Sequence, residues 1–134
     1  MQPRVSYLVG RLDRLLRRRL GDALAPHGLS LAEYTTLSVL RGRDGLSNAQ
    51  LARRALITPQ AMNEVLVRLE SRRLVRRRPH LQHGRVRPAE LTKAGERVLA
   101  GADRDVDEVE RAMLRSVETR SLRSLLRDAL RGLE

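Results

Sequence analysis

The feature that most constrains the fold is the stretch "SNAQLARRALITPQAMNEVLVRLESRRLVRRRP", which spans residues 47–79. It holds two amphipathic helical patterns in direct succession, separated only by the segment "ALI". Ser47, with Gln50 three residues later, has the spacing of a capping box, so a helix of about two turns begins there. We expect Leu51 and Leu56 to point into the core. Two helices this close in sequence predict a helix-turn-helix.

The second of these helices has a clear start and two different faces. Thr58 has the side chain of an N-cap, and Pro59 fits the first turn, where the missing N–H costs nothing. The buried stripe is expected to contain Met62, Val65, Leu66, Leu69 and Leu74. The opposite face carries Gln60, Ala61, Asn63, Glu64, Val67, Arg68 and Ser71. Such a helix lies on a core with its polar side in solvent.

A basic ribbon follows directly. "LVRRRP" and "RVRPAELT" can pair as antiparallel strands, with "HLQHG" at the tip and Gly84 in the turn. Pro79 and Pro88 confine these strands to an edge or an end of a sheet. The ribbon is therefore predicted to be a small exposed wing. The expected fold class is mainly α with a small β-wing, a winged helix-turn-helix.

Helical spacing of apolar residues continues on both sides of this unit. It predicts one helix over roughly residues 5–25 and another over about 31–40, with Ser30 as the N-cap. A long helix of about twenty residues begins after Thr92, and a shorter one ends the chain. The core must be aliphatic, because the chain has two tyrosines and neither phenylalanine nor tryptophan.

The terminal helices are too apolar on one face to remain in water, and a second copy of the chain is their simplest partner. We therefore divide the chain into an N-terminal dimerisation helix (1–28), a winged helix-turn-helix DNA-binding domain (29–92), and a long helix with a C-terminal dimerisation helix (93–134). The residues expected in the dimer interface are Leu8, Leu12, Leu122, Leu125, Leu126 and Leu130.

The net charge of +11 is concentrated where the helix-turn-helix lies. Residues 1–40 carry six arginines against three acids, and residues 41–93 carry thirteen cations against four acids. Residues 94–134 carry eight arginines against nine acids. An excess confined to the middle third is the footprint of a polyanion-binding surface. The alternative is a solvated face that only aids solubility.

In a winged helix-turn-helix the second helix enters the major groove with its N-terminal turns. Gln60 and Asn63 offer a donor and an acceptor to base edges, which suits adenine, while Thr58 and Ala61 can bring methyl groups to thymine. The basic ribbon would contact phosphates or the minor groove. The candidates for backbone or minor-groove contact are Ser47, Asn48, Arg53, Arg54, Arg68, Arg72, Arg73, Arg77, Arg78, Arg85 and Arg87.

Three stretches carry a family resemblance: "LSLAEYTTLSVL", "GLSNAQLARRALITPQAMNEVLVRLESRRLVRR" and "RVRPAELTKAGERVL". Within them, "LVRLESRRLVRR" resembles "LVDRLEERGLVRR" of the MarR family of transcriptional regulators, and "LTKAGE" resembles its "LTPAGR". The resemblance covers essentially the whole chain. It implies a homodimer, interlocked through its N- and C-terminal helices, that binds a pseudo-palindromic operator and represses transcription. It also implies release by a small anionic or phenolic ligand.

The chain departs from the family pattern at two positions. The family's wing tip commonly carries Asp-Arg-Arg, whereas this chain has His83-Gly84-Arg85, so Arg85 lacks the acidic residue that often orients it. Glu64 stands where many members have arginine. Its carboxylate could accept from cytosine N4 or pair with Arg68 four residues on, and we favour the ion pair.

A ligand pocket is expected where the first and the long helices meet the winged domain, with Tyr34 beside it. A packed Tyr34 with a satisfied hydroxyl is an equal alternative. His27 follows a proline at a helix end and is expected to be a C-terminal cap or a solvated turn residue. His80 and His83 lack a nearby third ligand, so a neutral or phosphate-contacting role is favoured over a metal site. No metal or cofactor is predicted.

Other protein classes fit less well. An RNA-binding protein would be expected to have lysine-rich tails and stacking aromatics, and both are missing. The carboxylates of "ADRDVDEVE" lie on an exposed helix face without a nucleophile–base pair or a phosphate loop, which argues against an enzyme. No apolar run approaches the roughly 18 residues of a membrane span. The absence of cysteine fits a reducing compartment and excludes cysteine-based peroxide sensing.

The sequence therefore predicts a cytoplasmic, dimeric DNA-binding regulator. Its expected partners are a double-stranded DNA operator, a second copy of itself and a small-molecule effector, with no membrane. The alternative is a protein that binds RNA or DNA without sequence preference.

Overall fold

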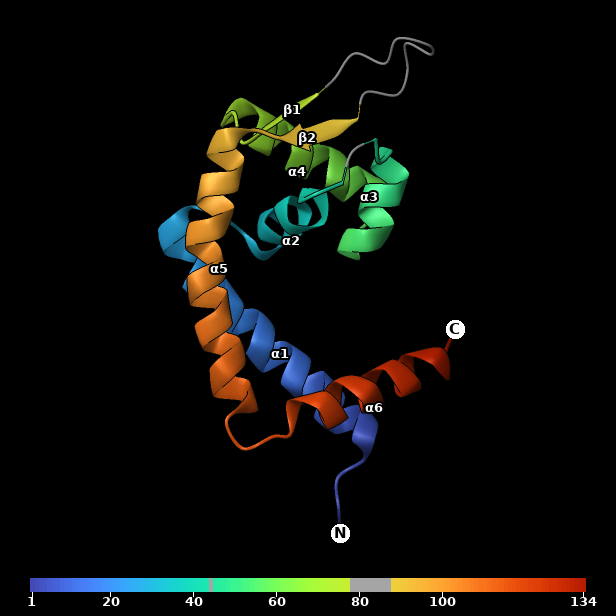
Figure 1. The fold of residues 1–134 in the computed structure, drawn as a ribbon. Coiled ribbons are helices and arrows are strands. Elements are labelled where there is room, and N and C mark those ends of the chain that lie inside the picture. Colours follow the sequence, from blue (N-terminus) through green and yellow to red (C-terminus); the bar gives the residue numbers. More distant parts are fainter. Residues whose placement is uncertain (44, 78–87) are drawn as a thin grey trace.

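The structure is a computed structural model that describes residues 1–43, 45–77 and 88–134. It is mainly helical with one two-stranded antiparallel sheet, as the sequence predicts (Figure 1). In chain order the elements are α1 (Val5–Leu24), a short 3₁₀ turn η1 (Ala25–His27), α2 (Leu31–Leu40), α3 (Asn48–Ala55), α4 (Pro59–Ser71), β1 (Val75–Arg77), β2 (Ala89–Leu91), α5 (Lys93–Leu114) and α6 (Thr119–Arg131).

The predicted helix starts are confirmed by their capping bonds. Ser30 and Ser47 each begin a helix with a full capping box: the hydroxyl accepts an N–H at 3.1 and 3.2 Å respectively. The side chain three residues on accepts the serine N–H at 2.9 Å in both cases. Thr58 caps α4 by accepting the Ala61 N–H at 3.1 Å. Because these N–H groups have partners, the start of each helix is fixed in place.

The core is aliphatic, as the composition requires. Leu24 of α1, Leu37 of α2 and Leu66 of α4 have 0% exposure, and Leu99 of α5 has 1%. All four belong to one apolar cluster. This cluster takes side chains from each of the three parts into which the sequence divides the chain. That division stays a prediction, but α4 packs in the same core as helices from both ends of the chain.

The base of the wing forms as expected. Strand β1 pairs with β2 in antiparallel register, with Val75 opposite Leu91 and Arg77 opposite Ala89. The predicted tip, including Pro79 and Gly84, lies outside the described residues. We refer to α2, α3, α4, β1 and β2 together as the reading head.

Two long helices support this head. Helix α1 packs along α5, and α6 projects from the far end of α5 (Figure 1). Helix α6 has no buried residue. Among the described residues, no helix combines the length and the apolar character needed to cross a membrane.

Helix α5 meets the reading head through a close backbone contact. A Cβ atom added to Gly95 would overlap the backbone carbonyl oxygen of Leu74, which lies between α4 and β1. That oxygen accepts the Thr92 N–H at 3.1 Å, and the Thr92 hydroxyl donates to the Arg73 carbonyl at 2.7 Å. Glycine is therefore required for α5 to begin this close to the end of α4.

We expect Gly95→Ala to lower the free energy of unfolding by about 2 kcal/mol, because the added methyl group meets backbone that cannot move aside. Helix propensity alone predicts the opposite sign. Gly101→Ala in the same helix is the matched control, since its Cβ would lie 3.6 Å from the His27 ring, an ordinary contact. The control should be neutral or gain about 0.5 to 1 kcal/mol. Urea unfolding of the two variants distinguishes these results, and equal effects would contradict the steric account.

Candidate nucleic-acid interface

Helices α3 and α4 are joined by a tight turn that the sequence predicts only in part. Leu51 is buried, with 1% exposure, as expected. The expectation that Leu56 points inward is wrong, because its side chain is 87% exposed. Leu56 ends α3 with φ of 60°, a left-handed conformation that reverses the chain and directs the side chain outward. The Ile57 N–H then donates to the Ala52 carbonyl at 3.1 Å and closes the turn.

Helix α4 has one buried face and one solvent-exposed face. Its buried side chains, none more than 2% exposed, are Met62, Val65, Leu66 and Leu69. Gln60 and Asn63 are exposed on the other side, and Ala61 is half-buried. The first two turns of α4 therefore present polar side chains to solvent while the rest of the helix is held by the core. This geometry suits a helix that reads bases in the major groove.

Some polar groups at this surface already have partners. The hydroxyl oxygens of Ser47 and Thr58 accept helix N–H groups as caps. Their hydroxyl hydrogens and the Thr58 methyl group remain available to a ligand. Asn48 Nδ2 donates to Asn63 Oδ1 and links the start of α3 to α4. Sequence patterns contain no sign of this last contact, because the two residues lie on different helices.

Two of the candidate arginines are engaged within the protein. Arg72 Nη1 donates to the Gly28 carbonyl at 2.6 Å and lies 3.7 Å from the Glu33 carboxylate, so it ties the end of α4 to the loop before α2. Arg77 Nε lies 3.4 Å from Glu70 Oε2. Both residues therefore have a structural role in the reading head. Their predicted contact with DNA gains no support from this geometry.

Other candidate arginines are exposed on the surface of α3 and at the end of α4. Within the described ranges, no ion pair is formed by Arg53, Arg54, Arg68 or Arg73. The ion pair favoured between Glu64 and Arg68, both of them described, does not form either. The predicted residues that lie outside the described part of the chain are Arg78, His80, His83, Arg85 and Arg87.

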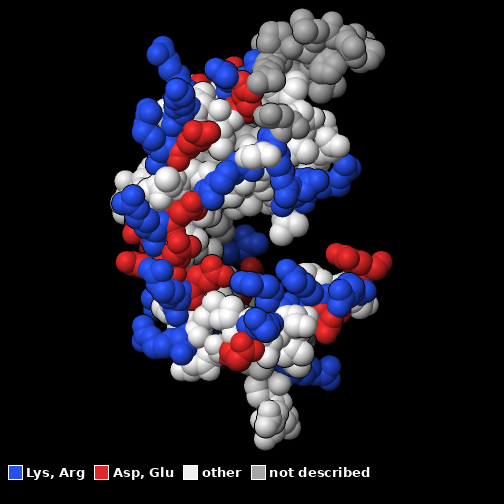
Figure 2. Space-filling model, in the orientation of Figure 1, with Lys and Arg blue, Asp and Glu red and all other residues white. Residues whose placement is uncertain are grey.

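The surface charge changes along the length of the molecule. Figure 2 shows lysine and arginine side chains spread over the reading head and over α6, whereas acidic side chains gather along the middle of α5. That acidic segment is "ADRDVDEVE". An anionic duplex would therefore be attracted to the reading head and repelled by the middle of α5.

Two of these acids connect α5 to the reading head and to η1. Asp103 accepts from the Tyr34 hydroxyl at 2.5 Å and from Arg41 Nη2 at 2.6 Å, so one of its oxygens is bound by α2 and the other by the residue that ends it. His27 Nε2 lies 2.6 Å from Asp105 Oδ2. The expectation that His27 is a cap or a solvated turn residue is wrong, because its side chain is only 23% exposed and is bound to α5. These contacts join residues far apart in sequence, which local patterns do not reveal.

Of the two alternatives for Tyr34, a residue beside a ligand pocket or a packed tyrosine with a satisfied hydroxyl, the structure shows the second. Burial is the largest cause of its altered acidity, followed by the hydrogen bond to Asp103 and the negative charge of that carboxylate. Together they raise the pKa of Tyr34 from 10.0 to about 12. The phenol therefore remains a neutral donor at neutral pH and keeps α2 attached to α5.

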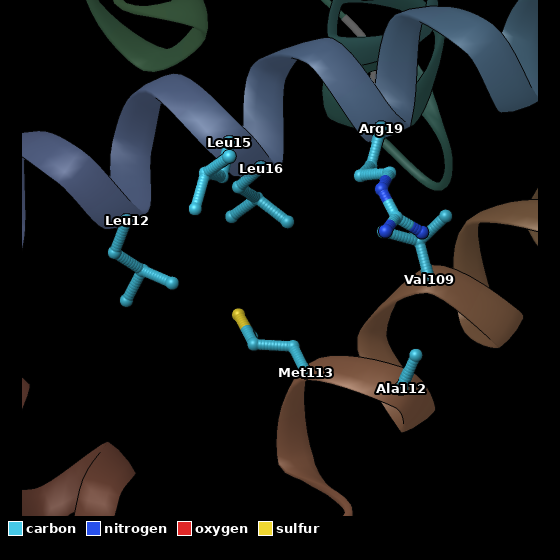
Figure 3. Close-up of a pocket in the computed structure, with 7 residues that line it drawn as sticks. All are labelled: Leu12, Leu15, Leu16, Arg19, Val109, Ala112 and Met113. Atoms are coloured by element: carbon cyan, nitrogen blue, oxygen red, sulfur yellow. The ribbon is translucent and has the colours of Figure 1, made fainter.

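An open cavity lies between α1 and α5, with a volume of about 320 Å³. Its lining residues are Leu12, Leu15, Leu16, Arg19, Val109, Ala112 and Met113. Figure 3 shows the three leucines projecting from α1 toward Met113, with Arg19 beside Val109 at one end. The cavity is thus apolar with a single cation. It lies along the α1–α5 pair, and Tyr34, predicted to be near a ligand, does not line it.

The leucines predicted to form a dimer interface are largely in solvent in the single chain. On α1, Leu8 and Leu12 are 46% and 41% exposed. On α6, Leu125, Leu126 and Leu130 are 65%, 44% and 59% exposed, while Leu122 is half-buried. These apolar faces are what a single chain leaves uncovered.

We expect Tyr34→Phe to lower the free energy of unfolding by about 1 kcal/mol near neutral pH, because Asp103 loses a donor. In the unfolded chain the Tyr34 hydroxyl ionises near pH 10.0, whereas in the folded chain its pKa is about 12. The stability of the wild type relative to the variant should therefore fall as pH rises from 10 towards 12. Urea unfolding of both proteins at about pH 8 and about pH 11 measures this difference. A difference that does not change with pH would contradict the assignment.

Comparisons with known proteins agree with this geometry. The model of the MarR family matches residues 27–86. The HTH-type transcriptional repressor Rv2887 of Mycobacterium tuberculosis is 39% identical over 121 residues, which are 90% of this chain and 81% of the repressor.

Solved structures of Rv2887 have the same fold. Its complex with DNA aligns with a TM-score of 0.76 at 36% identity, over 98% of each chain. Its complex with salicylic acid aligns with a TM-score of 0.74 at 36% identity, over 99% of this chain and 98% of the other. With this identity over nearly its whole length, the chain belongs to the MarR family of transcriptional regulators.

Proposed function

We propose that the chain is a DNA-binding transcriptional repressor that binds a pseudo-palindromic operator as a homodimer. The observation that carries the proposal is the exposed polar start of α4, held by a buried face in the core of the reading head. The similarity to Rv2887, which has been solved in complex with DNA, supports it over the same length of chain. Non-enzymatic action follows from the proposal, because the chemistry required is recognition alone.

Bases are read from the first two turns of α4. Gln60 and Asn63 are exposed there and supply amide donors and acceptors to base edges. Thr58 contributes its methyl group and its hydroxyl hydrogen, since its oxygen accepts a helix N–H. Ala61 is half-buried and supplies a small apolar surface for a thymine methyl.

Backbone contacts come from arginines that form no ion pair with any residue that the structure describes. Arg53 and Arg54 on α3 and Arg68 and Arg73 at the end of α4 are exposed and available to phosphates. Ser47 lies at the start of α3, where the helix dipole also favours a phosphate. Among the sequence candidates, Arg78, Arg85 and Arg87 remain proposals for the wing.

The dimer buries the apolar faces of α1 and α6 against a second copy. Burial of such faces is the usual driving force of association. A two-fold axis would place the two α4 helices about 34–36 Å apart, one turn of duplex, so that each reads one half of the operator.

The effector is proposed to be a small aromatic acid. The cavity between α1 and α5 is apolar apart from Arg19, so an aromatic ring can contact the leucines while a carboxylate pairs with the guanidinium. The salicylic acid complex of Rv2887 supports this ligand class. Helix α5 lines the cavity through Val109 and Met113 and also holds the reading head through Asp103. A ligand that binds better to a dimer with misplaced heads would therefore release DNA.

The first test is fluorescence anisotropy of the purified protein against duplex from upstream of its own gene, with scrambled duplex as control. We expect selective binding, with two protomers per site and an affinity that falls steeply with salt. If both duplexes bind equally and weakly, the assay is repeated with fragments from across the genome. Equal and weak binding to all of these fragments would contradict the proposal and favour the alternative of non-specific nucleic-acid binding.

The same assay tests the effector. Salicylate should weaken operator binding by the wild-type protein. For Arg19→Gln, about ten times more salicylate should be needed for the same loss of binding, because the carboxylate loses its charged partner. Arg17→Gln on the same helix is the matched control, since Arg17 pairs with Asp13 and does not line the cavity. An equal salicylate response in all three proteins would exclude this cavity as the effector site.

A further inference from the structure

Glu64 is an acidic side chain on the face of α4 that is proposed to read bases. Gln60, Asn63, Glu64 and Val67 stand at the helical spacing i, i+3, i+4 and i+7, so they share one face of α4. All four side chains are exposed. Recognition helices in DNA complexes read the major groove with residues at this same spacing. Glu64 therefore enters the groove whenever Gln60 and Asn63 do.

Glu64 differs from the other acids of the reading head. Three acids are described within residues 41–93, namely Glu64, Glu70 and Glu90. The carboxylates of Glu70 and Glu90 each form an ion pair with an arginine of β1. Glu64 forms neither an ion pair nor a side-chain hydrogen bond with any residue that the structure describes. Its carboxylate is therefore available to a group outside the chain.

An ionised carboxylate has one hydrogen-bonding role in every rotamer, because it can only accept. In the major groove cytosine presents the N4 amino donor, and adenine presents the N6 donor beside the N7 acceptor. Guanine and thymine present acceptors only. A carboxylate that faces guanine or thymine loses water and gains no donor, which is costly for a charged group. On the strand that it contacts, Glu64 thus favours cytosine, tolerates adenine and disfavours the other two bases.

We propose that Glu64 is a specificity-determining residue: it accepts a hydrogen bond from N4 of a cytosine in each half of the operator and excludes guanine and thymine from that position. This inference rests on the proposed function of α4. The ion pair with Arg68 that the sequence favoured would have occupied the same carboxylate, and it does not form between these two described residues.

The charge of Glu64 also affects binding to DNA of any sequence. It lies on the face proposed to approach the duplex, so it repels the phosphates. A cytosine amino group offsets this repulsion only at the matching base pair. Because specificity is a difference between two affinities, a residue that weakens binding to wrong sequences raises specificity. Removal of the charge should therefore strengthen binding to unrelated DNA and reduce selectivity, two effects of opposite sign.

The decisive variant is Glu64→Gln, which removes the charge and keeps the shape of the side chain. A glutamine amide both donates and accepts, and it pairs with N6 and N7 of adenine. The preferred base at the position should therefore change from cytosine to adenine. Glu64→Ala removes the acceptor as well, so that preference should disappear. Both variants should fold, because Glu64 is exposed, and thermal unfolding of each confirms this before binding is compared.

The experiment measures affinities of the full-length protein for a scrambled duplex and for operator duplexes substituted at one base pair in each half. At one position the wild type should prefer cytosine over guanine or thymine about tenfold, the value of one hydrogen bond to a charged group. Both variants should lose this preference and bind the scrambled duplex about twofold more tightly at low salt.

Glu96→Gln is the matched control. Glu96 is an exposed acid in the first turn of α5, so its substitution removes the same charge away from the reading face of α4. This variant should keep the base preference of the wild type at every position. Any change in its affinity should be the same for all duplexes.

The inference is overturned if Glu64→Gln and Glu64→Ala keep every base preference of the wild type, whatever their overall affinity, because Glu64 then acts like Glu96. It is also overturned if the preference that they lose is for guanine or thymine. If the wild-type protein shows no base preference at any position, the proposed function itself fails. The two failures are therefore distinguishable in one set of measurements.

Discussion

The reading surface depends on an aliphatic core that both ends of the chain share. Leu24 of α1, Leu66 of α4 and Leu99 of α5 are buried in one cluster, so the helix proposed to read DNA is packed with the helices proposed to form the dimer. The close approach at Gly95 strengthens this connection, because α5 begins against the backbone at the end of α4. Protein cores are densely packed, so a shift of α5 at this contact would also shift the end of α4. The direction of α4 is therefore set by the position of α1 and α5.

The polar contacts between α5 and the rest of the chain are weaker than this core. Asp103 and Asp105 are partly exposed and bind Tyr34, Arg41 and His27, and pairs of this kind contribute about 1 kcal/mol or less each. They lie on the same helix as the cavity that contains Arg19. A ligand proposed for that cavity would contact the same helix that carries these polar contacts. The reading head is therefore joined to α5 by a strong apolar link in the core and by weaker polar contacts at Asp103.

Local sequence patterns predict most of the fold. The Ser47 capping box, the N-cap at Ser30, the helix limits and the wing base depend on residues a few positions apart, and the structure confirms them. The positive φ of Leu56 is not predictable in this way, because that conformation normally selects glycine. The partners of His27, Arg72 and Asn48 also could not be predicted, since each contact joins separate elements. Local patterns therefore predict the position and the buried face of α4, but they do not show which residues of neighbouring elements hold it in place.

The central claim is that two reading heads are held at a fixed separation by one rigid dimer. The most direct test inserts half a turn of duplex, about five base pairs, between the two halves of the operator and measures affinity. The account predicts that affinity falls to that of a duplex with a single half-site, because the second head then faces the wrong side of the helix. Unchanged affinity would show that the heads move independently and would contradict the account.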